Sequence, residues 1–234
     1  MSCKVSVIQP VYNAAQYLEQ NLACWTGQTL ADIELIYVDD GSTDDSLRIL
    51  QDCAKKDSRI HLYVLPENKG TWAARNLGIE KAHGKYTLFA DADDTVLPET
   101  CEELARAMDE SQADILQYDM EILNPHGLPQ EDIAGVEQWV MPYDGLLYGR
   151  DVFTSCFRDG RYCWNLAGKV FRTELCKKVL SDIAAAGIQT ASLRAAEDAL
   201  LCFMLSYRAQ SYKGLPKKKY YQYYYGRGGS GQKH

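Results

Sequence analysis

Three aspartates lie close together in the segment TLFADADDTVLP, which covers residues 87–98. Asp91, Asp93 and Asp94 occupy three of four consecutive positions directly after an apolar run. Like charges a few ångströms apart raise one another's pKa and destabilise the ionised cluster. A divalent cation is the first candidate for what makes three acids tolerable there, because hard cations take carboxylate oxygens as ligands. The cluster therefore predicts a metal site, although a metal alone does not define a reaction.

Two other segments carry side chains that could bind a ligand. Asp39 and Asp40, in VDDGSTDDS, stand at the end of an apolar run, before a glycine and a helix start. A carboxylate there can accept hydrogen bonds from a base or a ribose, or it can cap the turn. We expect Asp39 to contact a ligand and leave both roles open for Asp40. Arg75, in ENKGTWAARNLGIEKAHGKY, could pair with a phosphate or an aspartate, or be a solvated charge on a helix.

The surrounding sequence alternates between short apolar runs and stretches with helical spacing. The runs predict strands at Val5–Ile8, Ile33–Val38, Ile60–Leu65, Tyr86–Phe89 and Ile115–Tyr118. The spacing predicts helices over residues 17–25, 42–54, from near 70, 98–111, 151–157, 174–186 and 196–207. Strand, helix and strand at a spacing of about thirty residues are typical of βαβ units and a mostly parallel sheet. Ligands bind such sheets at the carboxyl ends of the strands, so QPVYN and the acidic segments are expected to converge.

The C-terminal third is less regular. The stretch Asn124–Tyr143 is rich in helix breakers and predicts a loop over one end of the sheet. The later segment KKKYYQYYY, residues 217–225, predicts an edge strand with solvated lysines. Docking on anionic lipid and stacking on sugars are alternatives for the same residues. The glycine-rich residues 226–234 predict a mobile tail.

Composition limits the class of protein. The chain has 234 residues, of which 46% are hydrophobic and 24% charged, as expected for one soluble domain. The formal net charge of −7 argues against nucleic acid as a partner. The apolar runs are too short to span a bilayer, and the first ten residues lack the apolar core of a signal peptide, so we expect a cytoplasmic protein. Neither a G-x-x-x-x-G-K-[ST] phosphate loop nor a G-x-G-x-x-G fingerprint occurs, which disfavours nucleotide hydrolases and dinucleotide-binding enzymes.

Four segments together resemble the successive motifs of the family 2 glycosyltransferases, in particular the bacterial enzymes that build capsular, exo- or lipopolysaccharide. They are PVYNAAQYLEQNL, IELIYVDDGSTDDS, NKGTWAARNLGIEKAHGKYTLFADADD and AEDALLCFML. The resemblance implies an α/β GT-A fold with a mostly parallel central sheet flanked by helices and a smaller C-terminal acceptor-side region. It implies one domain over 1–234, with a nucleotide-sugar half at 1–123, an acceptor-side half at 124–225 and a flexible tail at 226–234.

The resemblance also implies an activity and its partners. Members of the family with these motifs are inverting, metal-dependent transferases that move a sugar from a nucleoside diphosphate, most often UDP, to a hydroxyl of an acceptor. The expected acceptor is a glycan or a lipid-linked glycan, with peripheral contact to the cytoplasmic face of the inner membrane. By the same resemblance Pro10, Tyr12 and Asn13 would line the nucleobase and ribose pocket. Asp39 would bind the base, and Arg75 would lie close to the nucleotide.

The remaining roles concern the chemistry. Asp91 and Asp93 match the D-x-D pair, of which Asp93 would ligate Mn²⁺ or Mg²⁺ and Asp91 would approach the ribose or a metal-bound water. Asp198 matches the catalytic base, with its neighbour Glu197 as the alternative. Both acids could instead only stabilise the start of a helix. Trp164 and Lys169 match segments near the acceptor and the donor.

Two other interpretations compete with this one. LFADADDTVL also resembles the nucleophile motif of haloacid dehalogenase-type phosphatases, in which Asp91 would be phosphorylated and Asp93 would act as the acid. That motif normally follows the first strand and has glycine where Asp94 stands, so we disfavour it. A non-catalytic relative that binds sugar nucleotides or glycans would not need a base such as Asp198.

Overall fold

The structure is a computed structural model that describes residues 3–188 and 197–227. Its strands are β1 (Val5–Val11), β2 (Ile33–Asp39), β3 (Ile60–Val64), β4 (Tyr86–Phe89), β5 (Thr95–Val96), β6 (Ile115–Leu123), β7 (Leu146–Tyr148), β8 (Lys169–Arg172) and β9 (Ser211–Tyr224). Its helices are α1 (Ala15–Thr26), α2 (Ser46–Ala54), α3 (Thr71–Lys81), α4 (Thr100–Ser111), α5 (Gln130–Val140), α6 (Arg150–Phe157), α7 (Thr173–Ala185) and α8 (Glu197–Arg208).

The described strands form one sheet in the order β3-β2-β1-β4-β8-β6-β9-β5, and β7 pairs with β9. β1 is parallel to β2 and β4, and β2 is parallel to β3. β8 runs antiparallel to both β4 and β6, so β6 and its parallel neighbour β9 point the same way as the first four strands. The prediction of a mostly parallel sheet is therefore confirmed, with β5, β7 and β8 running in the opposite direction.

Strand register brings the sequence-predicted ligand segments to one edge of the sheet. Val11 at the end of β1 lies opposite Asp39 at the end of β2, and the amide of Asp40 donates to the Val11 carbonyl. On the other side of β1, the amide of Ala90, just after β4, donates to the carbonyl of Ile8. The carboxyl ends of β1, β2 and β4 thus lie side by side, which is where open α/β sheets bind ligands.

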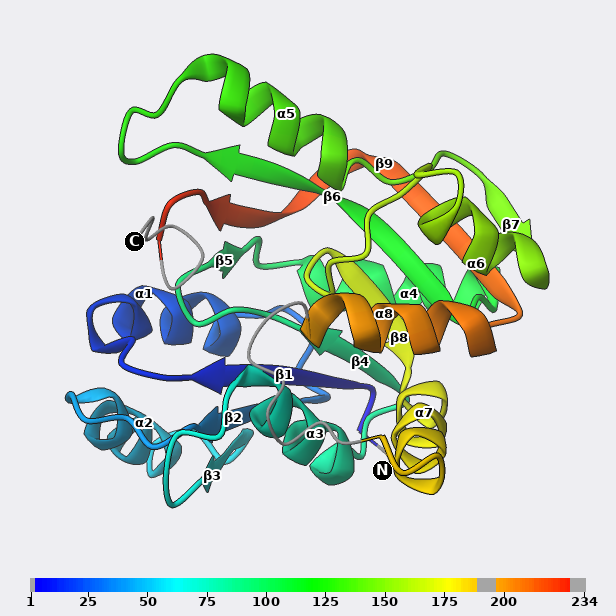
Figure 1. Cartoon of the computed structure of the whole chain (residues 1–234). Helices are drawn as coiled ribbons and strands as arrows, with labels where there is room; N and C mark the ends of the chain where they lie inside the picture. Colours follow the sequence, from blue (N-terminus) through cyan, green and yellow to red (C-terminus); the bar gives the residue numbers. More distant parts are fainter. Residues whose placement is uncertain (1–2, 189–196, 228–234) are drawn as a thin grey trace.

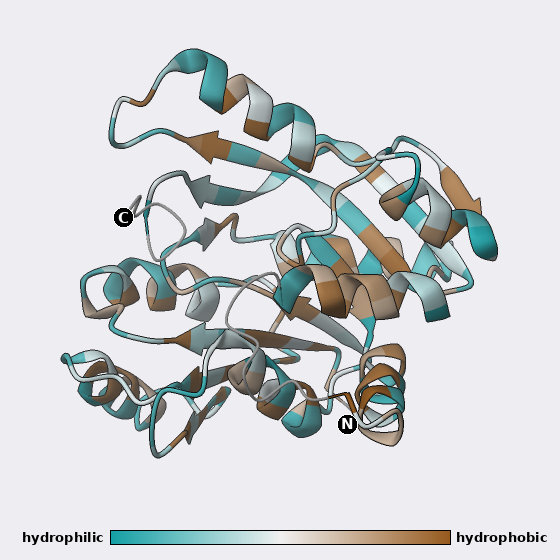
Figure 2. Cartoon of the chain, viewed as in Figure 1, coloured by the Kyte–Doolittle hydropathy of each residue, from teal (hydrophilic) through white to brown (hydrophobic). Residues whose placement is uncertain are grey.

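Each face of the sheet has its own apolar core, and the two cores recruit different helices (Figure 1). Alternate residues of β1 separate them, because Val5 and Val7 belong to one core and Ile8 to the other. The Val5 and Val7 side is covered by α1, α2, α4 and α5, and the Ile8 side by α3, α6, α7 and α8. Figure 2 shows apolar colour on several strands and on helices α7 and α8, and polar colour on many of the turns.

The loop predicted over Asn124–Tyr143 is wrong, because residues 130–140 form α5. Ile133 and Val140, seven positions apart, are buried on the same side of this helix, and Glu131 and Asp132 lie in its first turn. Gly135 and the breakers on either side of the helix masked this pattern in the sequence.

Residues 217–224 do belong to a strand, as predicted, but the prediction that this strand lies at an edge of the sheet is wrong. β9 begins earlier, at Ser211, and it is paired with β6 on one side and with β5 and β7 on the other. Tyr220 and Tyr221 are buried in the core as a result, whereas Lys218 and Lys219 pair with glutamates. Within the part of the chain that the structure describes, no helix has the length and apolar character that crossing a bilayer requires.

Candidate active site

Arg75 lies at the centre of a cluster of carboxylates. Its side chain is only 6% exposed, so the alternative of a solvated helix charge is wrong. Its guanidinium forms hydrogen bonds with Asp198 and, at 3.2 Å, with Asp91, and one nitrogen lies 3.6 Å from Glu197. Burial alone would lower the pKa of Arg75, but Asp198, followed by Asp91 and Glu197, raises it above its usual value. The arginine therefore remains charged and links the end of β4 to the start of α8.

Close packing of α3 against the sheet holds Arg75 in this position. Gly78, one turn after Arg75, faces β1, where an added Cβ would lie 2.3 Å from Cγ2 of Ile8. Only a residue without a side chain permits this approach. α3 begins after Gly70, whose amide, like that of Lys69, donates to the buried Asp40 carboxylate at 2.7–2.8 Å. Both Asp40 oxygens thus hold the turn into α3, which is the capping role.

The carboxylate predicted to be the base is fixed on both oxygens. Asp198 stands in the first turn of α8, with Oδ1 bonded to Arg75. Oδ2 accepts a hydrogen bond of 3.2 Å from the backbone amide of Leu166. The neighbouring Glu197 reaches Arg75 only at 3.6 Å, so the arginine orients Asp198 more tightly than Glu197.

Asp94 is buried and anchors the acidic segment to β9. Its carboxylate accepts a hydrogen bond from the Tyr221 hydroxyl and another from the Tyr224 amide, each at 2.9 Å. The same Tyr221 oxygen accepts from the backbone amide of Asp91 at 3.0 Å. Burial raises the pKa of Asp94 well above its usual value, and Asp91 and Asp93 raise it further. Tyr221 is therefore a site residue that the sequence did not reveal, because its tyrosine-rich segment is not distinctive and lies about 130 positions away.

Asp93 has the exposure and the chemistry of a metal ligand. Its residue is half-buried, and no salt bridge to its carboxylate occurs among residues 3–188 and 197–227. A partly desolvated carboxylate that forms no direct salt bridge suits a hard cation such as Mg²⁺ or Mn²⁺. Within the same ranges no three histidine, cysteine or acidic residues form a complete cluster of ligands. The residues thus fit a cation that takes one or two carboxylates here and completes its coordination on a substrate.

A second unanticipated residue, Arg227, lies next to Asp93. Its guanidinium stacks over Tyr224 at 3.7 Å and over Tyr17 at 5.2 Å, and donates to the Asp93 carbonyl at 3.5 Å. Residues 226 and 227 of the predicted tail are thus packed onto the domain, while 228–234 lie outside the described residues. This contact places a positive charge beside the predicted metal site.

The predicted nucleotide-binding residues lie at the adjoining ends of β1 and β2. Tyr12 is 49% exposed, and Pro10 is half-buried at the end of β1. The side-chain oxygen of Asn13 accepts from the amides of residues 43 and 44, so it ties the two strand ends together. Asp39 is buried; its Oδ2 accepts from the amide of Ser42 at 3.1 Å, while its Oδ1 has no hydrogen-bond partner among the residues that the structure describes. A buried carboxylate oxygen without a donor is costly unless a ligand supplies one.

Two of the predicted residues are set apart from this group. Lys169 is completely buried in β8, and its ammonium donates to the backbone carbonyl and side-chain oxygen of Asn165 at 2.6 and 3.0 Å. In this structure the Lys169 side chain is not accessible to a sugar-nucleotide donor. It holds the turn that carries Trp164. Trp164 itself is 37% exposed and forms an edge-to-face pair with Trp139 of α5.

The ionisation of Asp91 predicts a pH dependence of stability. Desolvation raises the pKa of Asp91 to about 6, opposed by Arg75 and reinforced by Asp93 and Asp198. A carboxyl with a higher pKa in the folded state destabilises the fold as pH rises from about 4 to 6. We therefore expect metal-free Asp91→Asn to melt above wild type at pH 7.5 and together with it near pH 4. The difference is modest, because part of the side chain contacts water. Melting curves between pH 4 and 8 measure it, and a difference independent of pH would contradict the assignment.

The sequence model of the family Glycosyl transferase family 2 matches residues 6–133, more than half of the chain. The chain therefore belongs to this family, and the sheet with helices on both faces is its GT-A fold. The matched region contains Asp39, Arg75 and the acidic segment that the sequence singled out. The haloacid dehalogenase alternative is wrong at the level of the family.

Relatives of known sequence and structure agree with this family, and one of them, TarS, matches most of the chain. An uncharacterised glycosyltransferase of Haemophilus influenzae is 48% identical over 92 residues, 39% of this chain and 37% of that protein. The poly(ribitol-phosphate) beta-N-acetylglucosaminyltransferase TarS of Staphylococcus aureus is 30% identical over 223 residues, 93% of this chain and 35% of TarS. The crystal structure of TarS residues 1–349 superposes with a TM-score of 0.72 at 27% identity, over 94% of this chain and 60% of that one. TarS has also been solved with UDP and with UDP-GlcNAc.

The alignments cover well under half the length of these relatives: 37% of the Haemophilus protein, 35% of TarS and 26% of the glycosyltransferase GlyA of Streptococcus pneumoniae. The similarity therefore concerns a shared glycosyltransferase domain.

Proposed function

We propose that this domain transfers a sugar from a UDP-sugar to a hydroxyl of a glycan or lipid-linked glycan, with inversion at the anomeric carbon. The acceptor belongs to bacterial surface polysaccharide synthesis, as the names of several relatives suggest for those proteins. The unpaired oxygen of Asp39, at the same sheet edge as a cation-suited acidic segment, is the observation that carries the proposal. Asp39 can recognise a nucleotide base, and a cation held at the acidic segment can bind a diphosphate.

Donor recognition rests on the ends of β1 and β2. The unpartnered Oδ1 of Asp39 suits the N–H of a uracil ring, which is a single donor of the kind that this oxygen lacks. The exposed ring of Tyr12 provides an aromatic face beside it, on which a base or ribose can pack. Pro10 and Asn13 complete the wall, with Asn13 holding the two strand ends in place.

Asp93, helped by Asp91, would hold Mn²⁺ or Mg²⁺ against the diphosphate of the donor. Such a cation neutralises the charge that gathers on a departing diphosphate. Arg227, stacked beside Asp93, adds a fixed positive charge on the same side. Tyr221 and Asp94 keep the backbone of the acidic segment in place, so that Asp91 and Asp93 project from a rigid turn.

Asp198 acts on the acceptor in this scheme. The acceptor hydroxyl oxygen attacks the anomeric carbon as the bond from that carbon to the diphosphate oxygen breaks, and the hydroxyl proton passes to the carboxylate. A positioned base contributes about a hundred- to ten-thousandfold to such a step. Arg75 and the Leu166 amide fix the orientation of Asp198, and Arg75 divides its charge among three carboxylates. Attack from the face opposite the diphosphate gives inversion.

Asp39→Ala is expected to weaken UDP binding by about ten- to a hundredfold. It removes a charge-assisted hydrogen bond worth about 1.5–3 kcal/mol. Calorimetry with UDP and Mn²⁺ measures the change, and Asp52→Ala, which alters an exposed aspartate of α2, is the control. Equal UDP affinity in wild type and Asp39→Ala would return Asp39 to a turn-capping role.

The activity itself is tested by incubating wild type with Mn²⁺ and a panel of UDP-sugars and measuring UDP release. We expect release from at least one donor. A protein that binds UDP but never releases it from any donor, with or without added glycans, would fit the non-catalytic alternative instead.

A further inference from the structure

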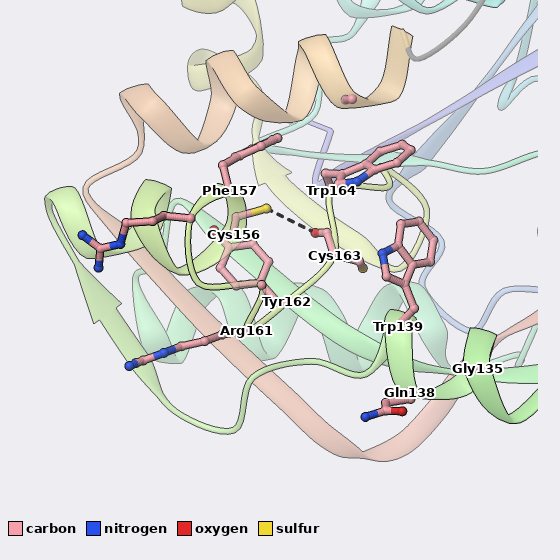
Figure 3. Close-up of a pocket in the computed structure, with 12 residues that line it drawn as sticks. Gly135, Gln138, Trp139, Cys156, Phe157, Arg161, Tyr162, Cys163 and Trp164 are labelled. Carbon is pink, nitrogen blue, oxygen red and sulfur yellow. Dashed lines mark hydrogen bonds between the residues drawn. The ribbon is translucent and has the colours of Figure 1, made fainter.

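A cavity of about 660 Å³ lies outside the donor site, between α5, the start of α8 and the segment 156–164 (Figure 3). Its walls include Gln138, Trp139, Phe157, Arg161, Trp164 and Ala199. This volume falls within the range of small-molecule sites, which combine an apolar wall with a few polar groups. The cavity therefore has the size and the composition of a ligand site.

Two tryptophans dominate one side of the cavity. The rings of Trp139 and Trp164 meet edge to face, with centroids 5.2 Å apart, and Figure 3 shows them next to each other. Their residues are 43% and 37% exposed, respectively. Large aromatic rings left open to water in a hollow mark a binding surface, because burying them would otherwise stabilise the fold.

The turn that carries Trp164 is rigid and touches the proposed base. Lys169 holds Asn165, the next residue, through two hydrogen bonds. The amide of Leu166 donates to Asp198, and Ala199, which follows Asp198, is part of the cavity wall. One wall of the cavity is thus continuous with the carboxylate to which an acceptor hydroxyl must come.

We propose that the Trp139–Trp164 cavity binds a sugar ring of the acceptor glycan. The proposal rests on the proposed function and specifies where the acceptor lies. A pyranose ring presents C–H groups on its faces and hydroxyls around its rim, so its faces pack on indole rings. Gln138, another residue of the wall, carries an amide that can donate N–H groups to the hydroxyls. A ring seated here carries its neighbouring sugar toward Asp198.

The test measures glycan binding and nucleotide binding separately on the same proteins. Wild type, the double variant Trp139→Ala/Trp164→Ala and the control Tyr148→Ala are probed in the presence of UDP and Mn²⁺. The probes are arrayed oligosaccharides that end in glucose, galactose, N-acetylglucosamine, N-acetylgalactosamine or glucuronic acid. Tyr148 is a matched control because it is an exposed aromatic residue of β7 outside the cavity wall. Melting temperatures establish folding, and the two single alanine variants serve if the double variant does not fold.

We expect the double variant to bind every oligosaccharide that wild type binds at least about tenfold more weakly. Its UDP affinity and the glycan binding of Tyr148→Ala should be unchanged. Equal glycan binding by the double variant and wild type overturns the proposal, as does a wild type that binds none of the oligosaccharides. A wild type that does not bind UDP overturns the proposed function instead, and the effect of the tryptophans on glycan binding is still read independently.

Discussion

Asp198→Asn is expected to lower the rate of sugar transfer by about a hundred- to ten-thousandfold. Asparagine keeps the shape of the side chain but cannot take up the proton of the acceptor hydroxyl. UDP affinity should barely change, because Asp198 lies at the start of α8 and not at the ends of β1 and β2, where we propose that the nucleotide binds. Single-turnover transfer assays and UDP calorimetry on the same preparation separate the two effects.

Glu197→Gln is the matched control, since it alters the adjacent acid in the same turn. Arg75 keeps two carboxylate partners in either variant, so we expect each to fold with a small loss of unfolding free energy, about 1–2 kcal/mol. A large rate loss in Glu197→Gln but not in Asp198→Asn would move the role of base to Glu197. Normal rates in both variants would contradict the mechanism.

Asp93→Asn is expected to abolish detectable transfer and to remove the Mn²⁺-dependent part of UDP binding. The variant loses the charged oxygen that we propose holds the cation, while the proposed donor contact at Asp39 remains. Titrations of UDP with Mn²⁺ and with EDTA, on wild type and variant, measure the change. UDP affinities that do not depend on Mn²⁺ in wild type would contradict the role of Asp93.

Asp94→Asn provides the contrast. Asp94 is buried on hydrogen bonds from Tyr221 and the Tyr224 amide, so this variant should still respond to Mn²⁺. The asparagine side chain has only one accepting oxygen, whereas the Asp94 carboxylate accepts on two. The main effect of the substitution should therefore be a lower melting temperature. A complete loss of the Mn²⁺ response in Asp94→Asn would make Asp94 a ligand.

Sequence patterns describe best the N-terminal part of the fold, which contains the adjacent parallel strands β1–β4. β1–β4 and α1–α4 are regular, and each has a local signal that repeats along the chain: an apolar run, a periodic stripe or acids in a first turn. The sequence does not predict α5, because Gly135 interrupts its stripe, or β8, because its charged end residues leave only Val170 and Phe171 as an apolar run. Local signals cannot reveal elements that only their neighbours stabilise.

The same limit separates the site residues. The sequence singles out the acidic segment, Asp39 and Arg75 as candidates because they stand at strand ends or on a helix between predicted strands. Tyr221 became visible only in three dimensions, since its hydroxyl bridges Asp91 and Asp94 from the far end of the chain. Lys169, in a segment that resembles the family's motifs, is a charged residue that the structure buries against Asn165.

The position of β9 has a consequence for how the protein is made. The strand inserts between β6 and the pair β5 and β7, and it supplies both hydrogen bonds that hold the Asp94 carboxylate. During translation β1–β4, which lie next to one another as parallel strands, emerge first. We expect a nascent chain that stops before residue 211 to fold β1–β4 while the Asp94 carboxylate still lacks its hydrogen bonds from Tyr221 and Tyr224. The acidic turn can therefore take its final geometry only after β9 has emerged from the ribosome.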